Sequence, residues 1–188
     1  MRIMTQMAVR LVGCCVLGAA ATLALAQEAA PAKPAVGSKA SPAEVYGKLL
    51  SSLEKEIVPA AEAMPEDKYD FVPTTGEYKG VNNFGQQVKH VAQANGYLFH
   101  DPDKPMPDTK AKFEALKTKA EMVQALKDSF AEAHAFVDAM TAENAFVVTA
   151  HGTRAGMATL GLAHMMDHYG QMVEYLRLNG IIPPASRH

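Results

Sequence analysis

The chain has 188 residues, 48% of them hydrophobic, and a formal net charge of −2. This length supports one domain with a buried core and is short for two domains. The nearly balanced charge provides no basic surface of the kind that binds nucleic acid, so we expect no nucleic-acid partner.

The first 26 residues have the pattern of a secretory signal peptide. Arg2 and Arg10 lie in the opening segment, residues 11–25 are almost wholly apolar, and Ala24-Leu25-Ala26 matches a small-residue cleavage site. We predict cleavage after Ala26 and export to a bacterial periplasm, with no membrane contact after cleavage.

Two other interpretations of this segment remain open. A retained membrane anchor is one, although the apolar run is short for a bilayer span. A lipoprotein is the other, because Leu11-Val12-Gly13-Cys14 is similar to a lipobox, although Arg10 leaves little apolar sequence before Cys14.

Cleavage after Ala26 removes both cysteines of the chain, Cys14 and Cys15. The mature protein then has no disulfide, no thiolate nucleophile and no cysteine metal ligand.

The folded domain is predicted over residues 41–184, after a flexible spacer rich in alanine, proline and lysine over residues 27–40. Residues 185–188 form a short C-terminal tail. The first helix begins at Ser41-Pro42-Ala43-Glu44, where serine is the N-cap, proline is the first helical residue and glutamate lies three residues after the serine.

Apolar residues at spacings of three and four predict the buried face of this first helix. They are Val45, Leu49, Leu53 and Ile57, with Tyr46 and Leu50 beside them. We expect Pro59 to kink or end the helix and Pro65 to stop any continuation.

A loop over residues 65–80 is expected to cross the end of the domain. Its aromatic residues are expected to pack inward: Tyr69, Phe71 and Tyr78. The second helix is predicted over about residues 81–99. On this helix Gln87 and Asn83 lie one and two turns before His90, which predicts a polar patch on an inward face.

The third helix is predicted over about residues 119–139. Its inward residues follow the helical period: Met122, Leu126, Phe130, Ala133 and Val137. Residues 142–152 contain β-favouring residues without a partner strand, so we predict a loop or a short irregular segment there.

The fourth helix, over about residues 154–179, carries His164 and His168. These histidines lie one turn apart on the same face, so both imidazoles can reach one metal ion. The residues expected on the same side are Met157, Leu160, Gly161, Gln171, Tyr175 and Leu178, with Met165, Met172 and Leu176 widening the buried stripe. The residues expected on the exposed side are Asp167, Gly170, Glu174 and Arg177. Gly180 can adopt a left-handed conformation, and Pro183 and Pro184 follow it, so the helix should stop there.

Four helices around one core predict an all-α fold, an antiparallel four-helix bundle. Two inward polar rings are costly in such a core unless something binds them. His90 is the best third ligand, because it lies mid-helix on an inward face with polar neighbours. An isolated histidine of this kind is more often a hydrogen-bonded core residue, and a bare pair four residues apart occurs in many helices by chance.

The remaining polar residues have lesser expected roles. Gln87, Gln171 and Asn83 are expected to orient the metal ligands or the substrate from behind. Tyr97 and Tyr175 could donate to a bound anion or belong to the core. His134 is either a fourth ligand or a core residue, and we favour the core. The histidines expected to be solvated are His100, His151 and His188.

A family resemblance joins these features. The mid-helix His90, the run from His164 to Gln171 and the ending Gly180-Ile181-Ile182-Pro183-Pro184 resemble the DinB superfamily. The segment from Met64 to Pro73 is similar to the connection between the family's first two helices, and the resemblance extends over about residues 44–184. It implies an up-down-down-up bundle, three histidines on a divalent metal, frequent homodimers and, in some members, thiol-dependent transfer or isomerisation.

We therefore expect a metal-dependent hydrolase or transferase with three histidine ligands and an open position for water or a small-molecule substrate. A non-catalytic metal-binding or structural bundle in the periplasm is the alternative. Imidazole ligands favour zinc or nickel, and iron or manganese also fit.

Overall fold

The computed structural model describes residues 35–187, which form five α-helices and no strand. The helices are α1 (Pro42–Ala63), α2 (Phe84–Leu98), α3 (Lys110–Ala115), α4 (Lys119–Asp138) and α5 (Arg154–Leu178), with short 3₁₀ turns η1 (Glu66–Lys68) and η2 (Pro184–Ser186). The predicted all-α class is confirmed. The predicted signal peptide and most of the predicted spacer lie outside the described residues. None of the helices in residues 35–187 is long and apolar enough to cross a membrane.

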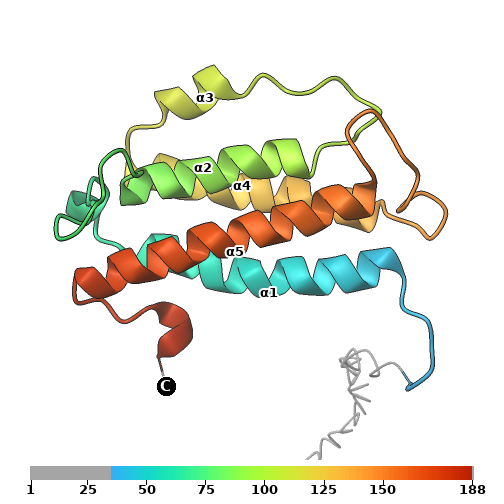
Figure 1. The fold of residues 1–188 in the computed structure, drawn as a ribbon, viewed down its shortest axis with the longest axis horizontal. Helices are drawn as coiled ribbons and strands as arrows, with labels where there is room; N and C mark the ends of the chain where they lie inside the picture. Colours follow the sequence, from blue (N-terminus) through green and yellow to red (C-terminus); the bar gives the residue numbers. More distant parts are fainter. Residues whose placement is uncertain (1–34, 188) are drawn as a thin grey trace, which may run out of the picture. The chain divides into compact units, whose positions relative to one another are not determined.

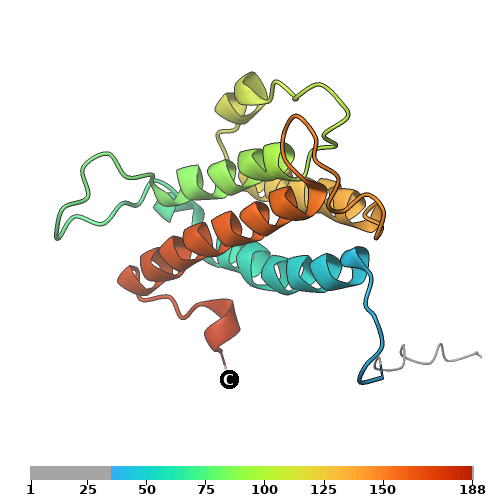
Figure 2. The same ribbon diagram turned by 45° about the vertical axis from the view of Figure 1, so that its right-hand side comes forward.

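The four long helices pack into one bundle (Figures 1 and 2). Each packs against two others, in the order α1, α4, α2, α5 and back to α1. Following the colours in Figure 1, α1 and α5 run in one direction and α2 and α4 run in the opposite direction. The directions along the chain are therefore up, down, down and up. This order makes α2 and α5, which carry the three candidate ligands, antiparallel neighbours.

The helix starts are fixed by side-chain caps. In α1, α2 and α4 the residues Ser41, Asn83 and Thr118 each accept from a backbone N–H three residues later, and the side chain at that later position accepts in return from the cap residue's N–H. Each capping box satisfies two N–H groups that would otherwise lack partners. At the other end of α5, Gly180 has φ of 73°, the left-handed conformation that the sequence predicted for the helix stop.

The core lies between the four long helices. Its largest fully buried apolar side chains are Leu50, Ile57, Met64, Phe84, Leu126, Phe130, Met165, Met172 and Leu176. Burying a side chain of this size stabilises the fold by about 1.5–3 kcal/mol relative to leaving it in water. This apolar packing offsets the cost of placing polar rings on α5.

The predicted buried face of α1 was wrong at two of its four central positions. Val45 and Leu49 are exposed, whereas Leu50 and Ile57 are fully buried. The inward side follows Tyr46, Leu50, Leu53 and Ile57, of which Tyr46 and Leu53 are partly buried. The helical period was therefore right, and only the N-terminal half of the stripe was displaced. The helix continues through Pro59 to Ala63 and ends before Pro65, which agrees with the expected stop at Pro65.

Three other inward predictions were wrong. Tyr78 is exposed because it lies near the tip of the loop between η1 and α2, beyond the buried Tyr69 and the half-buried Phe71. Leu160 and Leu178 are also exposed, since they lie at the edges of the α5 face that the histidines share. The predicted exposure of Asp167, Gly170, Glu174 and Arg177 agrees with the structure.

The short helix α3 was not predicted from the sequence. It lies along the outside of α2 (Figures 1 and 2) and packs on it through the buried Phe113. Just before it, the Thr109 hydroxyl donates to the Tyr97 hydroxyl of α2 at 3.1 Å. A six-residue helix is too short for its apolar period to be recognised in the sequence.

Candidate metal centre

Three histidines from two helices bring their ring nitrogens together. The Nε2 atom of His164 lies 3.1 Å from that of His90 and 3.2 Å from that of His168. One ligand atom from each of the three rings lies within 4.8 Å of the others. His164 and His168 meet because they are one turn apart on α5, and His90 joins them because α2 packs alongside.

This arrangement has the dimensions of a metal site. Two nitrogens bound tetrahedrally to one zinc ion at 2.0–2.1 Å are separated by about 3.3 Å, close to the observed spacing. Three lone pairs directed at one point repel each other, so the cluster either shares a proton among its Nε2 atoms or holds a cation. The residues present therefore fit a divalent ion held by three imidazoles.

The protonation states of the rings also suit a metal site. Burial, followed by the nearby His164 and His90 rings, lowers the pKa of His168 to about 4, with Asp167 opposing the shift. Burial and then the His90 ring lower the pKa of His164, again against Asp167. Both rings are therefore neutral near pH 7, and neutral imidazole is the form that binds metals.

A chain of hydrogen bonds fixes the orientation of His168. Its Nδ1–H donates to Gln87 Oε1 at 2.5 Å, and Gln87 Nε2 donates to Gln171 Oε1 at 2.7 Å. Gln171 Nε2 in turn donates to Asp167 Oδ2 at 3.3 Å. With its proton held at Nδ1, His168 directs an Nε2 lone pair at the centre of the cluster. Gln87 and Gln171 thus lie behind His168, although the sequence placed Gln87 beside His90.

Comparison with known protein families agrees with this geometry. The family model described as the DinB superfamily matches residues 49–172, which include all three histidines. The chain belongs to the DinB superfamily. No curated protein matches the sequence. The match covers most of the bundle, so this DinB protein combines the family fold with a histidine cluster that can hold a metal ion.

The three rings of the DinB cluster differ in exposure. His168 is buried, His164 is partly buried and His90 is exposed. The inward prediction for His90 was therefore wrong for the ring as a whole, although its Nε2 reaches His164. His164 Nδ1 is buried and has no hydrogen-bond partner among the described residues. Solvent thus reaches the cluster from the His90 side.

Asn83 does not take the supporting position expected for it. Its Oδ1 accepts from the Gln86 N–H as the cap of α2, and its amide donates to Asp70 at 3.1 Å. Asp167 ends the hydrogen-bond chain behind His168, a role that was not predicted for it. The signal for Asp167 is its position four residues before Gln171, a spacing at which helical side chains meet.

Of the two tyrosines, Tyr175 belongs to the core, as the second of its two predicted roles. Tyr97 accepts from Thr109, and the Tyr175 hydroxyl donates to the Asn82 carbonyl at 3.0 Å. His134 is neither a fourth ligand nor a fully buried core residue, because its Nε2 lies 2.8 Å from Glu54 Oε2 at a half-exposed position. His151 is exposed as predicted, and His188 lies outside the described residues.

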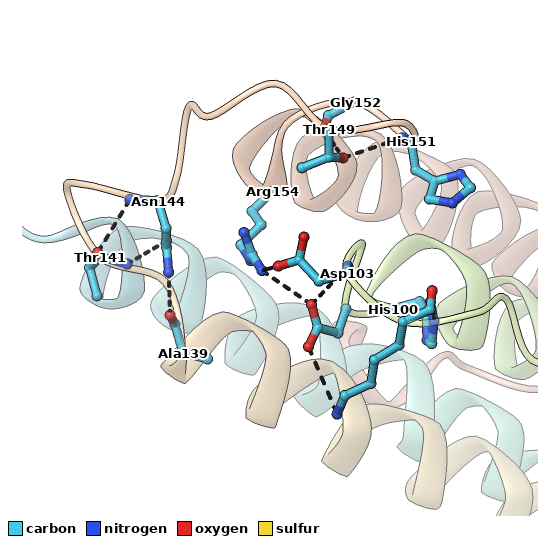
Figure 3. A network of polar contacts seen from close by, with 11 residues as sticks. His100, Asp103, Ala139, Thr141, Asn144, Thr149, His151, Gly152 and Arg154 are labelled. Atoms are coloured by element: carbon cyan, nitrogen blue, oxygen red, sulfur yellow. Dashed lines mark hydrogen bonds and ion pairs between the residues drawn. The ribbon is translucent and has the colours of Figure 1, made fainter.

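A second polar cluster, here called the Arg154 network, lies where α5 begins (Figure 3). One guanidinium nitrogen of Arg154 donates to Asp101 at 3.1 Å and to Asp103 at 2.6 Å. The backbone N–H of Asp103 and the Arg154 and Lys104 charges lower the pKa of Asp101. His100, expected to be solvated, is half-buried beside this network, with Nε2 3.2 Å from the Lys104 carbonyl. A cavity of about 540 Å³ adjoins the network, but no histidine of the metal cluster lines it.

Proposed function

We propose that this DinB protein is a divalent-metal-dependent hydrolase or transferase whose ion is held by His90, His164 and His168. The convergence of three Nε2 atoms from α2 and α5 is the observation that carries the proposal. A divalent ion held by three neutral ligands keeps its full charge and supplies Lewis-acid chemistry. Zinc or nickel is the favoured ion, with iron or manganese as alternatives that imidazole ligands also accept.

The residues of the chain have distinct parts in this proposal. His168 is oriented by Gln87, whose amide is held by Gln171, so this ligand is rigid before an ion arrives. His90 is exposed and lies at the accessible side of the cluster. Asp167 anchors the hydrogen-bond chain and raises the pKa of both α5 histidines against the effect of burial. The exposed side of the cluster is where a substrate reaches the site.

Metal content tests the site directly. Untagged protein should hold about one divalent ion per chain, whereas His164→Ala and His168→Ala should lose it, because two ligands do not complete the site. His134→Ala is the matched control, since His134 is paired with Glu54 away from the cluster. Elemental analysis is the measurement. Equal metal content in all four proteins would refute the proposal.

The exposure of His90 favours an enzyme over the alternative, a non-catalytic metal-binding or structural bundle. X-ray absorption on the loaded protein distinguishes the two. Three nitrogen ligands and at least one exchangeable oxygen ligand would support catalysis. A shell filled by protein atoms, together with no chelator-sensitive hydrolysis or transfer on small esters, amides and thiols, would support the bundle that only binds.

We also propose export to the periplasm with cleavage after Ala26, supported by the apolar segment and the Ala24-Leu25-Ala26 motif. Sequencing the N-terminus of protein secreted by a bacterial host should find Gln27 first. An uncleaved chain, or one that begins with a modified Cys14, would contradict this proposal.

A homodimer is proposed for the same protein. Apolar side chains are exposed on adjacent helices, with Val45 and Leu49 on α1 and Leu160 on α5, and the Tyr46 and Thr159 hydroxyls join these helices at 2.9 Å. Light scattering should give twice the chain mass for the native protein. Leu160→Glu should give a monomer, because a charge in an apolar interface lacks a partner. A monomeric native protein would refute the proposal.

A further inference from the structure

A cavity of about 340 Å³ lies between α2 and the short helix α3. Its wall on α2 includes Gln86, Lys89, His90 and Gln93, and its wall on α3 includes Lys110, Phe113 and Glu114. This volume is within the range of sites that hold small molecules. The cavity is the place where a small molecule can rest against a histidine of the metal cluster.

The charge of this cavity is positive in a chain whose net charge is negative. Lys89 is the single charged residue in the sequence of α2. It makes no hydrogen bond or ion pair through its ammonium group within residues 35–187, whereas Lys110 lies 3.9 Å from Glu114 on its own helix. The charged residues that line the cavity are therefore two lysines, Lys89 and Lys110, and one acidic residue, Glu114. An uncompensated cation in a partly enclosed cavity attracts anions.

The rest of the cavity supplies an apolar contact and hydrogen-bond donors. Phe113 is only 7% exposed and so has a fixed position. The Gln86 Oε1 atom accepts from the Asn83 N–H, which leaves the amide NH₂ of Gln86 able to donate. A ligand that fits these groups carries an acidic group and an apolar body.

We propose that this α2–α3 cavity binds the substrate of the metal centre and that the substrate is a small organic anion. Its carboxylate lies at Lys89, its apolar body lies against Phe113, and its reacting group lies on the His90 side. The inference rests on the proposed metal-dependent function and adds to it the class of substrate.

The first test uses chelator-treated protein and benzoate as the probe, with neutral benzamide as its matched control. Benzoate should shift the amide NMR signals of α2 and α3 residues that line the cavity, and benzamide should shift them much less. Lys89→Gln should raise the apparent Kd of benzoate about fivefold, the effect of one partly screened ion pair. Lys89→Arg should restore binding to within about twofold of the native value, since the charge returns.

The control variant is Lys48→Gln, which removes a lysine from the exposed surface of α1 outside the cavity. It should leave the affinity unchanged. Equal shifts with benzoate and benzamide, shifts gathered elsewhere on the protein, or equal losses in Lys48→Gln and Lys89→Gln would each overturn the inference.

The second test ties the cavity to the metal centre. Cobalt-loaded protein should change its visible absorption on addition of benzoate, and Lys89→Gln should need about five times more benzoate for the same change. Unchanged cobalt bands during saturating benzoate binding would overturn the inference. Failure of the native protein to retain cobalt would instead refute the proposed function.

Discussion

The histidine cluster and the Arg154 network both include residues of α5, but their charges and lone pairs are satisfied in different ways. Around Arg154, a cation whose side chain is 14% exposed meets two carboxylates, so each charge has a partner within the chain. In the cluster, three ring nitrogens converge and none of the described residues supplies a cation. A network whose charges are all paired stabilises the fold. A cluster with unpaired lone pairs is costly until a ligand binds them.

The same contrast applies to a single residue type. His134 has Glu54 as its partner. His168 has Gln87 at Nδ1 and the His164 ring nitrogen at Nε2, with a nitrogen of His90 within 4.8 Å. A polar residue in a helix thus indicates a binding site only when one of its lone pairs has no donor or cation among the neighbouring residues. Four predictions test this comparison, from the largest expected effect to the smallest.

Metal binding should stabilise the protein most. Added zinc at about a hundred to a thousand times its Kd should raise the free energy of unfolding by about 3–4 kcal/mol, because the ion binds the folded state. His168→Ala should lose this increase and Arg154→Met should keep it. Thermal unfolding with and without zinc is the measurement. If zinc stabilises His168→Ala as much as the native protein, the histidine cluster does not differ from the Arg154 network in binding a metal ion.

Gly161 lies between the two regions, three residues before His164. A Cβ at this position would overlap the buried ring of Phe99, which also lines the cavity beside Arg154. Gly161→Ala should therefore destabilise the protein by about 2 kcal/mol through overpacking. Gly170→Ala is the control, since nothing lies within 4 Å of its added methyl group, and it should stabilise α5 by up to about 1 kcal/mol. Urea unfolding of both variants measures these changes in the free energy of unfolding. An unchanged value for Gly161→Ala would show that the Phe99 ring moves to make room for the methyl group.

Gln87→Leu should weaken zinc affinity about tenfold by removing the acceptor that orients His168. The apolar replacement has a similar volume, so the fold should persist. Competition with a coloured chelator measures the affinity. Gln124→Leu, at an exposed position of α4 outside the cluster, is the comparison variant and should bind zinc normally. Equal zinc affinity in the native protein and in Gln87→Leu would show that the hydrogen-bond chain does not contribute to metal binding.

Arg154→Met should have the smallest effect, a loss of about 1 kcal/mol at pH 7. The folded state holds the pKa of Asp101 below its usual value, so this carboxylate stabilises the fold above the unfolded pKa of about 3.9. That contribution is lost as the pH falls through the lower folded pKa. The difference between native protein and variant should therefore shrink from pH 7 to pH 3 in urea unfolding. A constant difference would show that Arg154 acts through its apolar stem instead.

The residues that the sequence placed correctly are those governed by contacts within one helix. Capping at Ser41, the turn between His164 and His168, and the stop at Gly180 all depend on residues within five positions of each other. Periodicity also identified Leu126 and Phe130 as buried. It failed for Leu160 and Leu178, because a helical stripe has edges whose burial depends on the width of the neighbouring helix.

The sequence alone determined the four long helices, their boundaries to within a few residues, and the two histidines that share one face of α5. Only the tertiary structure decided that His90 Nε2 meets His164, that Gln87 rather than Asn83 supports His168, and that α3 covers α2 beside His90. These contacts depend on the rotation and axial offset of α2 against α5. Packing throughout the core determines this rotation and this offset together, so the apolar period of a single helix does not predict them.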